Sequence, residues 1–130
     1  TRDYANLAKS MPAMVMTSGL MPTFAFLEGK GEVEHRTLLA HALFWLSRRR
    51  MLNEGLLGQE GEYWRAIAVV SSKHANKDEK QRAERYLSQV FRQAMEQLRA
   101  MNARQYQRAT EETLAILKWI RHFADAVKGE

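Results

Sequence analysis

Residues 4–30, YANLAKSMPAMVMTSGLMPTFAFLEGK, decide how the rest of the chain is organised. Residues 10–27 carry no charged side chain, a run long enough to meet the lower limit for a membrane span. Pro12, Gly19 and Pro22 interrupt this run, however, and its hydroxyl side chains lower its hydropathy. The stretch therefore predicts a buried corner of a helical protein rather than a membrane helix.

We expect two short helices to meet at this corner. Ser10 is placed to cap the start of the first helix, and Gly19 is placed to close it. Pro22 would open the second helix, because a proline is tolerated in the first helical turn. Leu20 and Leu27 are the expected core anchors, so both helices would be covered by the rest of the chain.

The composition predicts a single helical domain over residues 1–130. A chain of this length buries about two thirds of its unfolded surface, which is enough for a core without cross-links. The absence of cysteine excludes disulfides and thiolate metal sites. The chain shows no charged-then-apolar leader with a cleavage site, so a cytoplasmic protein is expected. No cofactor is expected either.

The charge of the chain is concentrated in its middle. The net charge is +5, and residues 36–108 hold 14 Lys and Arg against 7 Asp and Glu. The segments on either side each have a balance of −1. A basic middle indicates an acidic partner such as a nucleic acid.

The remaining sequence is typical of an all-α protein, because no segment alternates apolar and polar residues as a half-buried strand does. A helix is expected over 34–52, with Arg48, Arg49 and Arg50 marking its end. A flexible loop over 53–61 should dock two leucines on the core, and a short helix should follow over 62–72.

Two longer helices complete the expected fold. Asn76 with Glu79 forms a capping box before a helix that runs to about Met101, and Asn102 with Gln105 is the next cap. Both helices carry apolar stripes at spacings of three and four. The stripe residues are Ala83, Leu87, Val90, Ala94, Leu98 and Met101, then Tyr106, Ala109, Thr113, Leu117, Ile120, Ala124 and Val127. We therefore predict a compact helical bundle of five or six helices with two long antiparallel C-terminal helices.

The arginines give the clearest functional signal. Arg85, Arg92 and Arg99 recur every seven residues, so they share one line along their helix. A line of arginines fits a phosphate backbone, which is recognised by charge and spacing. Together with Arg48–Arg50 this line is the predicted nucleic-acid-binding site, although a solvated helix face is the alternative. The aromatic side chains of Trp119 and Phe123 are expected in the core by their spacing.

Catalytic motifs are scarce. Arg36 and His41 form an RxxxxH arrangement that resembles the active-site motif of HEPN ribonucleases, which cut RNA without a metal ion. That chemistry needs both side chains in one cleft, and the spacing alone is not specific. His122 and Asp125 supply two metal ligands where a site needs at least three, so no metal site is expected.

Two blocks of sequence resemble the small subunit of the Cmr (type III-B) CRISPR effector complex, and they bracket nearly the whole chain. The first block contains Tyr4, Pro12, Ser18, Gly19, Leu20, Thr23, Phe26, Leu27 and Lys30. The second block contains Tyr106, Thr110, Glu112, Thr113, Lys118, Trp119, Ile120, Arg121, Phe123 and Ala124. Neither block is a catalytic signature.

The resemblance implies a noncatalytic structural subunit acting in antiviral defence. Copies would stack on each other along the guide-RNA filament, contact the repeated backbone subunit and the large subunit, and help to bind target single-stranded RNA. Cleavage would belong to other subunits. The alternatives are a HEPN-like ribonuclease that uses Arg36 and His41, and a helix-turn-helix DNA binder, which lacks a clear short turn here.

Overall fold

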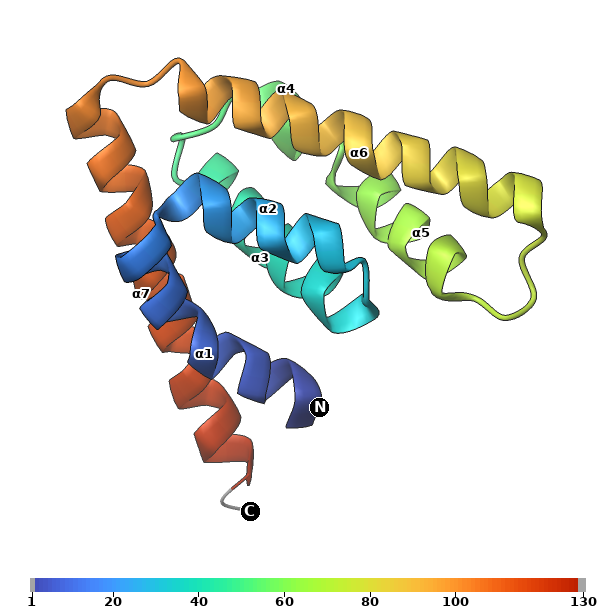
Figure 1. Cartoon of the computed structure of the whole chain (residues 1–130), viewed down its shortest axis with the longest axis horizontal. Helices are drawn as coiled ribbons and strands as arrows, with labels where there is room; N and C mark the ends of the chain where they lie inside the picture. The colour runs from blue at the N-terminus through green and yellow to red at the C-terminus, as the bar shows by residue number, and fades with distance from the viewer. Residues whose placement is uncertain (1, 129–130) are drawn as a thin grey trace.

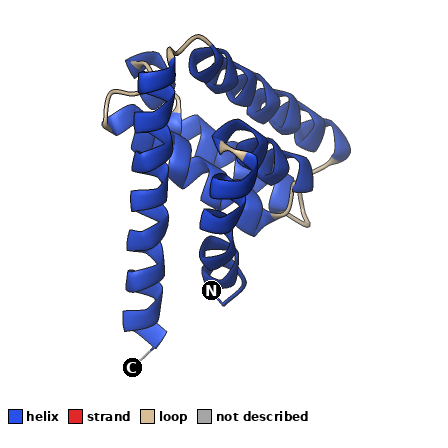
Figure 2. Cartoon of the chain, turned by 60° about the vertical axis from the view of Figure 1, so that its left-hand side comes forward, coloured by secondary structure: helices blue, strands red, loops and turns tan. Residues whose placement is uncertain are grey.

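A computed structural model describes residues 2–128, and every regular element in this part of the chain is a helix (Figure 2). The predicted all-α bundle is therefore confirmed, with seven helices in the described residues where about five or six were expected. Of the predicted domain over 1–130, Thr1 and residues 129–130 lie outside the described residues. The seven helices are α1 (Arg2–Ser18), α2 (Leu20–Lys30), α3 (Val33–Arg48), α4 (Glu54–Leu57), α5 (Glu60–Ser71), α6 (Lys77–Arg99) and α7 (Ala103–Lys128).

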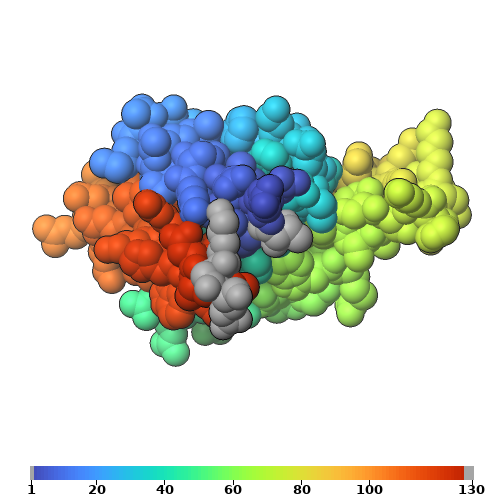
Figure 3. Space-filling model, turned by 90° about the horizontal axis from the view of Figure 1, so that it is seen from below, coloured from blue at the N-terminus to red at the C-terminus, as the bar shows by residue number. Residues whose placement is uncertain are grey.

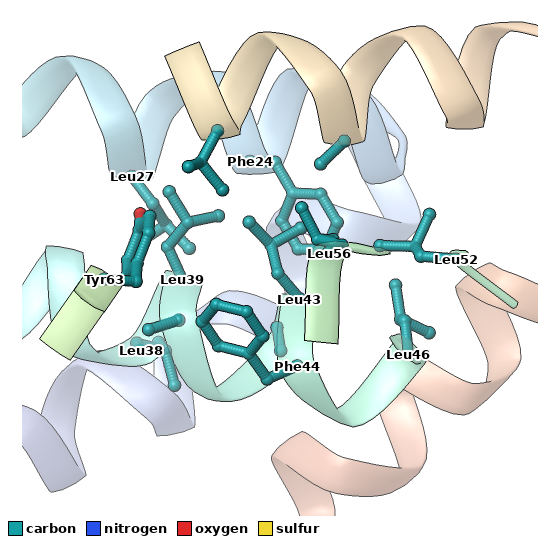
Figure 4. Packing of buried hydrophobic residues seen from close by; sticks show 14 of the residues in the cluster. Phe24, Leu27, Leu38, Leu39, Leu43, Phe44, Leu46, Leu52, Leu56 and Tyr63 are labelled. Atoms are coloured by element: carbon teal, nitrogen blue, oxygen red, sulfur yellow. The ribbon is translucent and has the colours of Figure 1, made fainter. Parts of the chain in front are cut away.

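Helix α3 lies at the centre of the bundle and packs against α1, α2, α4, α5 and α7 (Figure 1). Its central turns are apolar on most sides, which is the pattern of a helix buried all round. Leucines and aromatic rings from α2, α4 and α5 surround it (Figure 4). The buried side chains include Phe24, Leu27, Leu38, Leu39, Leu43, Phe44, Leu46, Leu52, Leu56 and Tyr63.

The predicted corner between α1 and α2 forms at Gly19. This residue has φ 97° and ψ 167°, a region of backbone conformation that only glycine occupies readily. Leu20 and Leu27 are buried on the α2 side, as expected. Pro22 lies in the first turn of α2, where its missing N–H costs no helical hydrogen bond.

The predicted start of the first helix is wrong. Helix α1 begins at Arg2 and continues through Pro12, and the Ser10 hydroxyl donates to the carbonyl of Leu7 instead of capping a helix. A proline inside a helix removes one hydrogen bond and bends the helix axis. Figure 1 shows α1 bending partway along its length. Burial of Ala8, Met11 and Val15 against the bundle offsets the lost hydrogen bond.

The predicted caps of the two long helices are confirmed. The Asn76 side chain accepts from the backbone N–H of Glu79 at 2.8 Å, and the Glu79 carboxylate accepts from the Asn76 N–H at 3.0 Å. Asn102 and Gln105 make the same reciprocal pair at 2.8 and 3.0 Å. Each pair satisfies backbone donors that a helix start leaves without partners.

The predicted antiparallel packing of the two long helices is wrong. Figure 1 shows α7 turning away from α6 instead of running back along it. The apolar stripe of α6 packs mainly on α5, with further contacts to α2 and α4, whereas α7 packs on α1 and α3. Because the two stripes have different partners, the two helices have little apolar surface left to bury against each other.

The expected loop over 53–61 contains the single helical turn of α4. The Asn53 side chain accepts from the backbone N–H of Leu56 and caps this turn. Leu56 is buried and Leu57 is half-buried, so both dock on the core as predicted. Among the described residues, no helix is both long enough and apolar enough to cross a membrane.

Substitution of Gly19 tests the backbone geometry of the corner between α1 and α2. Gly19→Ala should lower the free energy of unfolding by about 1–3 kcal/mol, because alanine resists this backbone conformation. A Cβ at Gly19 would meet Pro22 at an ordinary 3.6 Å, so the cost is conformational rather than steric. Chemical denaturation monitored by circular dichroism measures the change.

Gly29 in α2 is the matched control, since no atom lies within 4 Å of a Cβ built there. Gly29→Ala should leave stability unchanged or raise it by up to about 1 kcal/mol. Equal effects of the two substitutions would contradict the proposed role of the Gly19 backbone.

Candidate nucleic-acid interface

Arg85, Arg92 and Arg99 are exposed along one line of α6. Seven residues are close to two helical turns, so the three side chains lie above one another along the helix. The line lies nearly opposite the buried stripe of the same helix. Within residues 2–128, Arg85 and Arg92 form no ion pair, whereas Arg99 binds Glu96 at 2.7 Å. The line is therefore a solvent-facing row in which two guanidinium groups have no anionic partner in the described part of the chain.

The three consecutive arginines at the end of α3 do not form one cluster. Arg48 binds Glu60 of α5 at 2.6 Å. Arg49 lies 3.2 Å from Glu112 of α7 and stacks on the Trp45 ring, with 5.9 Å between guanidinium carbon and ring centroid. Successive residues at a helix end point in different directions, so the side chains reach different neighbours.

Arg50 has a left-handed backbone with φ 62°, the one described non-glycine residue with a positive φ. Its N–H donates to the carbonyl of Ser47 at 3.0 Å, and the N–H of Met51 donates to the carbonyl of Leu46 at 2.9 Å. These two bonds form a Schellman motif, in which glycine normally occupies the left-handed position. Arginine at this position costs backbone energy that glycine would avoid.

A hollow of about 360 Å³ lies where α3 ends and α6 turns into α7. Arg49 and Arg50 line one part of it, and Arg108 of α7 lines another. Arg108 is absent from the predicted nucleic-acid-binding site. No local pattern could have added it, because Arg108 lines the hollow together with Arg50 only through the direction in which α7 leaves α6.

A second, more open hollow of about 660 Å³ runs beside α6. It is lined by Arg92 and by several amide side chains, and Gln97 belongs to both hollows. Gln97 therefore joins the surface around Arg92 to the surface around Arg50 and Arg108. In contrast, Arg85 and Arg99 line neither hollow.

Arg36 and His41 do not share a cleft. The Arg36 guanidinium donates to the carbonyl of Gly31 at 2.9 Å and lies 3.8 Å from Glu84 of α6. His41 instead bonds through Nδ1 to the Tyr4 hydroxyl of α1, and its ring lies 5.2 Å from that of Trp64. The two side chains thus leave α3 on different sides, which disfavours the acid–base pair that ribonuclease chemistry needs.

Burial shifts the pKa of both Tyr4 and His41 towards the neutral form. Burial raises the pKa of Tyr4 to about 12, so its hydroxyl stays protonated at neutral pH. Burial lowers the pKa of His41, so its ring is neutral there. The described residues contain no cluster of three or more side chains suited to holding a metal ion, and Asp125 pairs with Lys9 at 3.0 Å.

The predicted core position of Trp119 and Phe123 is wrong, since 62% and 59% of their surfaces are exposed. They line a mostly apolar groove of about 740 Å³ between the start of α1 and the end of α7, which lie side by side in Figure 3. The last turns of α7 line this groove together with the start of α1, and Trp119 and Phe123 stay exposed there. Arg121 is also exposed on these turns.

Three further residues of the resemblance make contacts within the described chain. Phe26 is half-buried and lies against the ring of His35, with centroids 5.8 Å apart. The Lys30 amine lies 5.8 Å from the centroid of the Phe26 ring. The Tyr106 hydroxyl accepts from the backbone N–H of Met21 at 2.9 Å, so the two blocks of sequence meet in space.

Comparison with known families gives one finding. The model of the family described as CRISPR-associated protein (Cas_Cmr5) matches residues 1–127. The chain has no significant match to a curated protein or to a solved structure.

The left-handed position of Arg50 gives a prediction about stability. Arg50→Gly should raise the free energy of unfolding by about 0.5–1 kcal/mol, because glycine removes the cost of the left-handed backbone. Arg49→Gly is the control, since Arg49 has φ −82° and binds Glu112. That control should be destabilising in the same denaturation experiment. A loss of stability in Arg50→Gly would show that the arginine side chain stabilises the fold.

Proposed function

Because the chain belongs to the CRISPR-associated Cas_Cmr5 family, the small subunits of Cmr (type III-B) effector complexes, we propose that it is a noncatalytic structural subunit that contacts RNA. Membership of the family means that it works within a complex of Cmr subunits. The proposal adds an RNA-binding surface, a set of neighbours and a location in the cytoplasm, where the complex would serve antiviral defence.

The observation that carries the RNA-binding proposal is the exposed arginine line of α6. Fourteen helical residues separate Arg85 from Arg99, a rise of about 21 Å. That length matches three or four phosphates of an extended single strand. With Arg50 beside the end of α6, about five phosphates would be neutralised in all.

Charge contacts of this kind recognise the backbone and not the bases. A subunit that follows many guide and target sequences needs this property. Single-stranded target RNA, held beside the guide RNA, is therefore the proposed ligand.

The proposed protein neighbours are the repeated backbone subunit, the large subunit and further copies of this chain. Trp119 and Phe123 support a role among other proteins, because exposed aromatic patches are typical of protein–protein contacts. One copy would bind RNA weakly. Copies held side by side would bind strongly, since each later contact becomes intramolecular.

The arrangement of the candidate residues supports a noncatalytic role. Ribonuclease chemistry requires a base and a phosphate-stabilising cation at one reacting centre. Arg36 and His41 contact different neighbours on different sides of α3. Cleavage is therefore assigned to other subunits of the complex.

Removing the arginine line should weaken RNA binding. We expect wild-type affinity for single-stranded RNA to fall roughly a hundredfold between 50 and 200 mM salt, from about five contacts at about 0.7 each. The variant with Arg85, Arg92 and Arg99 changed to Ala should lose most of this slope. Fluorescence anisotropy with the assembled complex, or with the isolated protein at low salt, measures both quantities.

A charge-matched control changes Arg65, Lys73 and Lys118 to Ala, three exposed cations outside the line. Its salt slope should stay close to wild type. If the arginine-line variant and the control bind alike, with circular dichroism showing both folded, α6 is only a solvated face and the proposal fails.

Nuclease activity should be absent. Purified protein incubated with labelled single-stranded RNA, with and without Mg²⁺, should leave the RNA intact on a denaturing gel. Cleavage that disappears in His41→Ala would support the HEPN-like ribonuclease instead.

A further inference from the structure

The hollow between the end of α3 and the α6–α7 turn is lined by side chains that donate hydrogen bonds. Among its described lining residues there is no carboxylate. Three guanidinium groups and two side-chain amides provide its polar groups, and methionine and alanine provide the rest. The lining residues are Arg49, Arg50, Met51, Gln97, Ala100, Met101, Gln105 and Arg108.

The two amides are oriented by backbone groups. Oε1 of Gln97 accepts from the N–H of Asn53 at 2.7 Å, and Oε1 of Gln105 accepts from the N–H of Asn102 at 3.0 Å. A backbone N–H can only donate, so each amide must present its oxygen to it. Neither Nε2 group has an acceptor within residues 2–128, which leaves both as free donors at the hollow.

The arginines that line the hollow are only partly neutralised by ion pairs within the described chain. Glu112 pairs with Arg49 but does not line the hollow, and within the described chain Arg50 and Arg108 form no ion pair. Like charges gathered in one place repel each other, and a bound anion removes this repulsion. Guanidinium groups bind phosphate oxygens in pairs through their planar fork of donors.

Arg50 adds an independent observation. It occupies a left-handed position at which glycine would be less strained. Strained residues that persist are frequently functional. The side chain kept at this cost is one of the two unpaired cations of the hollow.

We propose that this hollow is a phosphate-binding site that holds one backbone phosphate of single-stranded RNA. The inference rests on the proposed function and adds Arg108, Gln97 and Gln105 to its RNA-contacting residues. The strand would reach the hollow from the surface around Arg92, because Gln97 lines both. Arg49 and Arg50 act here, whereas Arg48 is held by Glu60 on another side.

The first test removes one cation. Arg108→Ala should weaken single-stranded RNA binding roughly threefold to tenfold at 50 mM salt and lower the salt slope by about 0.7. Arg104→Ala is the control, because Arg104 is an exposed cation of the same helix that does not line the hollow. Equal losses in the two variants would overturn the site.

The second test replaces a donor without disturbing the fold. Gln105→Glu keeps the oxygen that accepts from the Asn102 N–H, and a glutamate suits this capping position. It replaces the free Nε2 donor by a negative charge, so RNA affinity should fall roughly tenfold. Gln107→Glu on the same helix changes the net charge equally outside the hollow, and its affinity should fall much less.

The Arg50→Gly variant tests whether a loss of RNA affinity could come from misfolding. This variant should be more stable than wild type and yet bind RNA more weakly, roughly as Arg108→Ala does. A more stable variant with full RNA affinity would remove Arg50 from the site.

Inorganic phosphate separates this inference from the proposed function. In NMR titrations of the folded protein, phosphate should shift the side-chain amide signals of Gln97 and Gln105, and 5′-hydroxyl RNA should shift the same signals. If RNA binding weakens only when the arginine line of α6 is removed, the proposed function stands and the phosphate site in the hollow is refuted. If phosphate shifts these signals but RNA does not bind the wild type, the hollow binds free phosphate, and both RNA proposals fail.

Discussion

The structure depends on the backbone break at Gly19. Its glycine-only conformation ends α1 and redirects the chain, so that α2 lies on α3 while α1 lies along α7. The hydrogen bond from the Met21 N–H to the Tyr106 hydroxyl then fixes this corner to the first turns of α7. Residues 85 positions apart are thereby joined, and the two blocks that carry the family resemblance form one packed unit.

The local features of the fold could be predicted because each depends on residues three or four positions apart. The caps at Asn76 and Asn102 and the buried stripe of α6 are of this kind. The direction of α7 could not be predicted, because it depends on the apolar surface that α1 and α3 offer. The start of α1 was predicted wrongly for the same reason. Burial of the neighbours of Pro12 in α1 outweighs the hydrogen bond that this proline removes.

The candidate site was predictable only in part. The seven-residue spacing was enough to place Arg85, Arg92 and Arg99 on one exposed line. Adjacency in sequence was misleading at Arg48, which the turn of the helix directs to Glu60 and away from Arg50. The hollow is formed by three segments that are separate in the sequence. The Nε2 group of Gln105 is free because its Oε1 accepts the capping hydrogen bond. The donors that line the hollow can therefore be recognised only in the folded structure.

A phosphate held at this hollow, as proposed, would couple the stability of the subunit to RNA binding. The left-handed backbone of Arg50 costs the free subunit stability, and repulsion among the guanidinium groups that line the hollow would add to this cost. A bound phosphate would relieve the repulsion but not the backbone cost, so binding would recover only part of the lost stability. Since a ligand that binds only the folded state stabilises it, a subunit on its RNA would resist unfolding more than a free one. In this proposal, arginine at position 50 lowers the stability of the free protein and supplies a positive charge where the phosphate would bind.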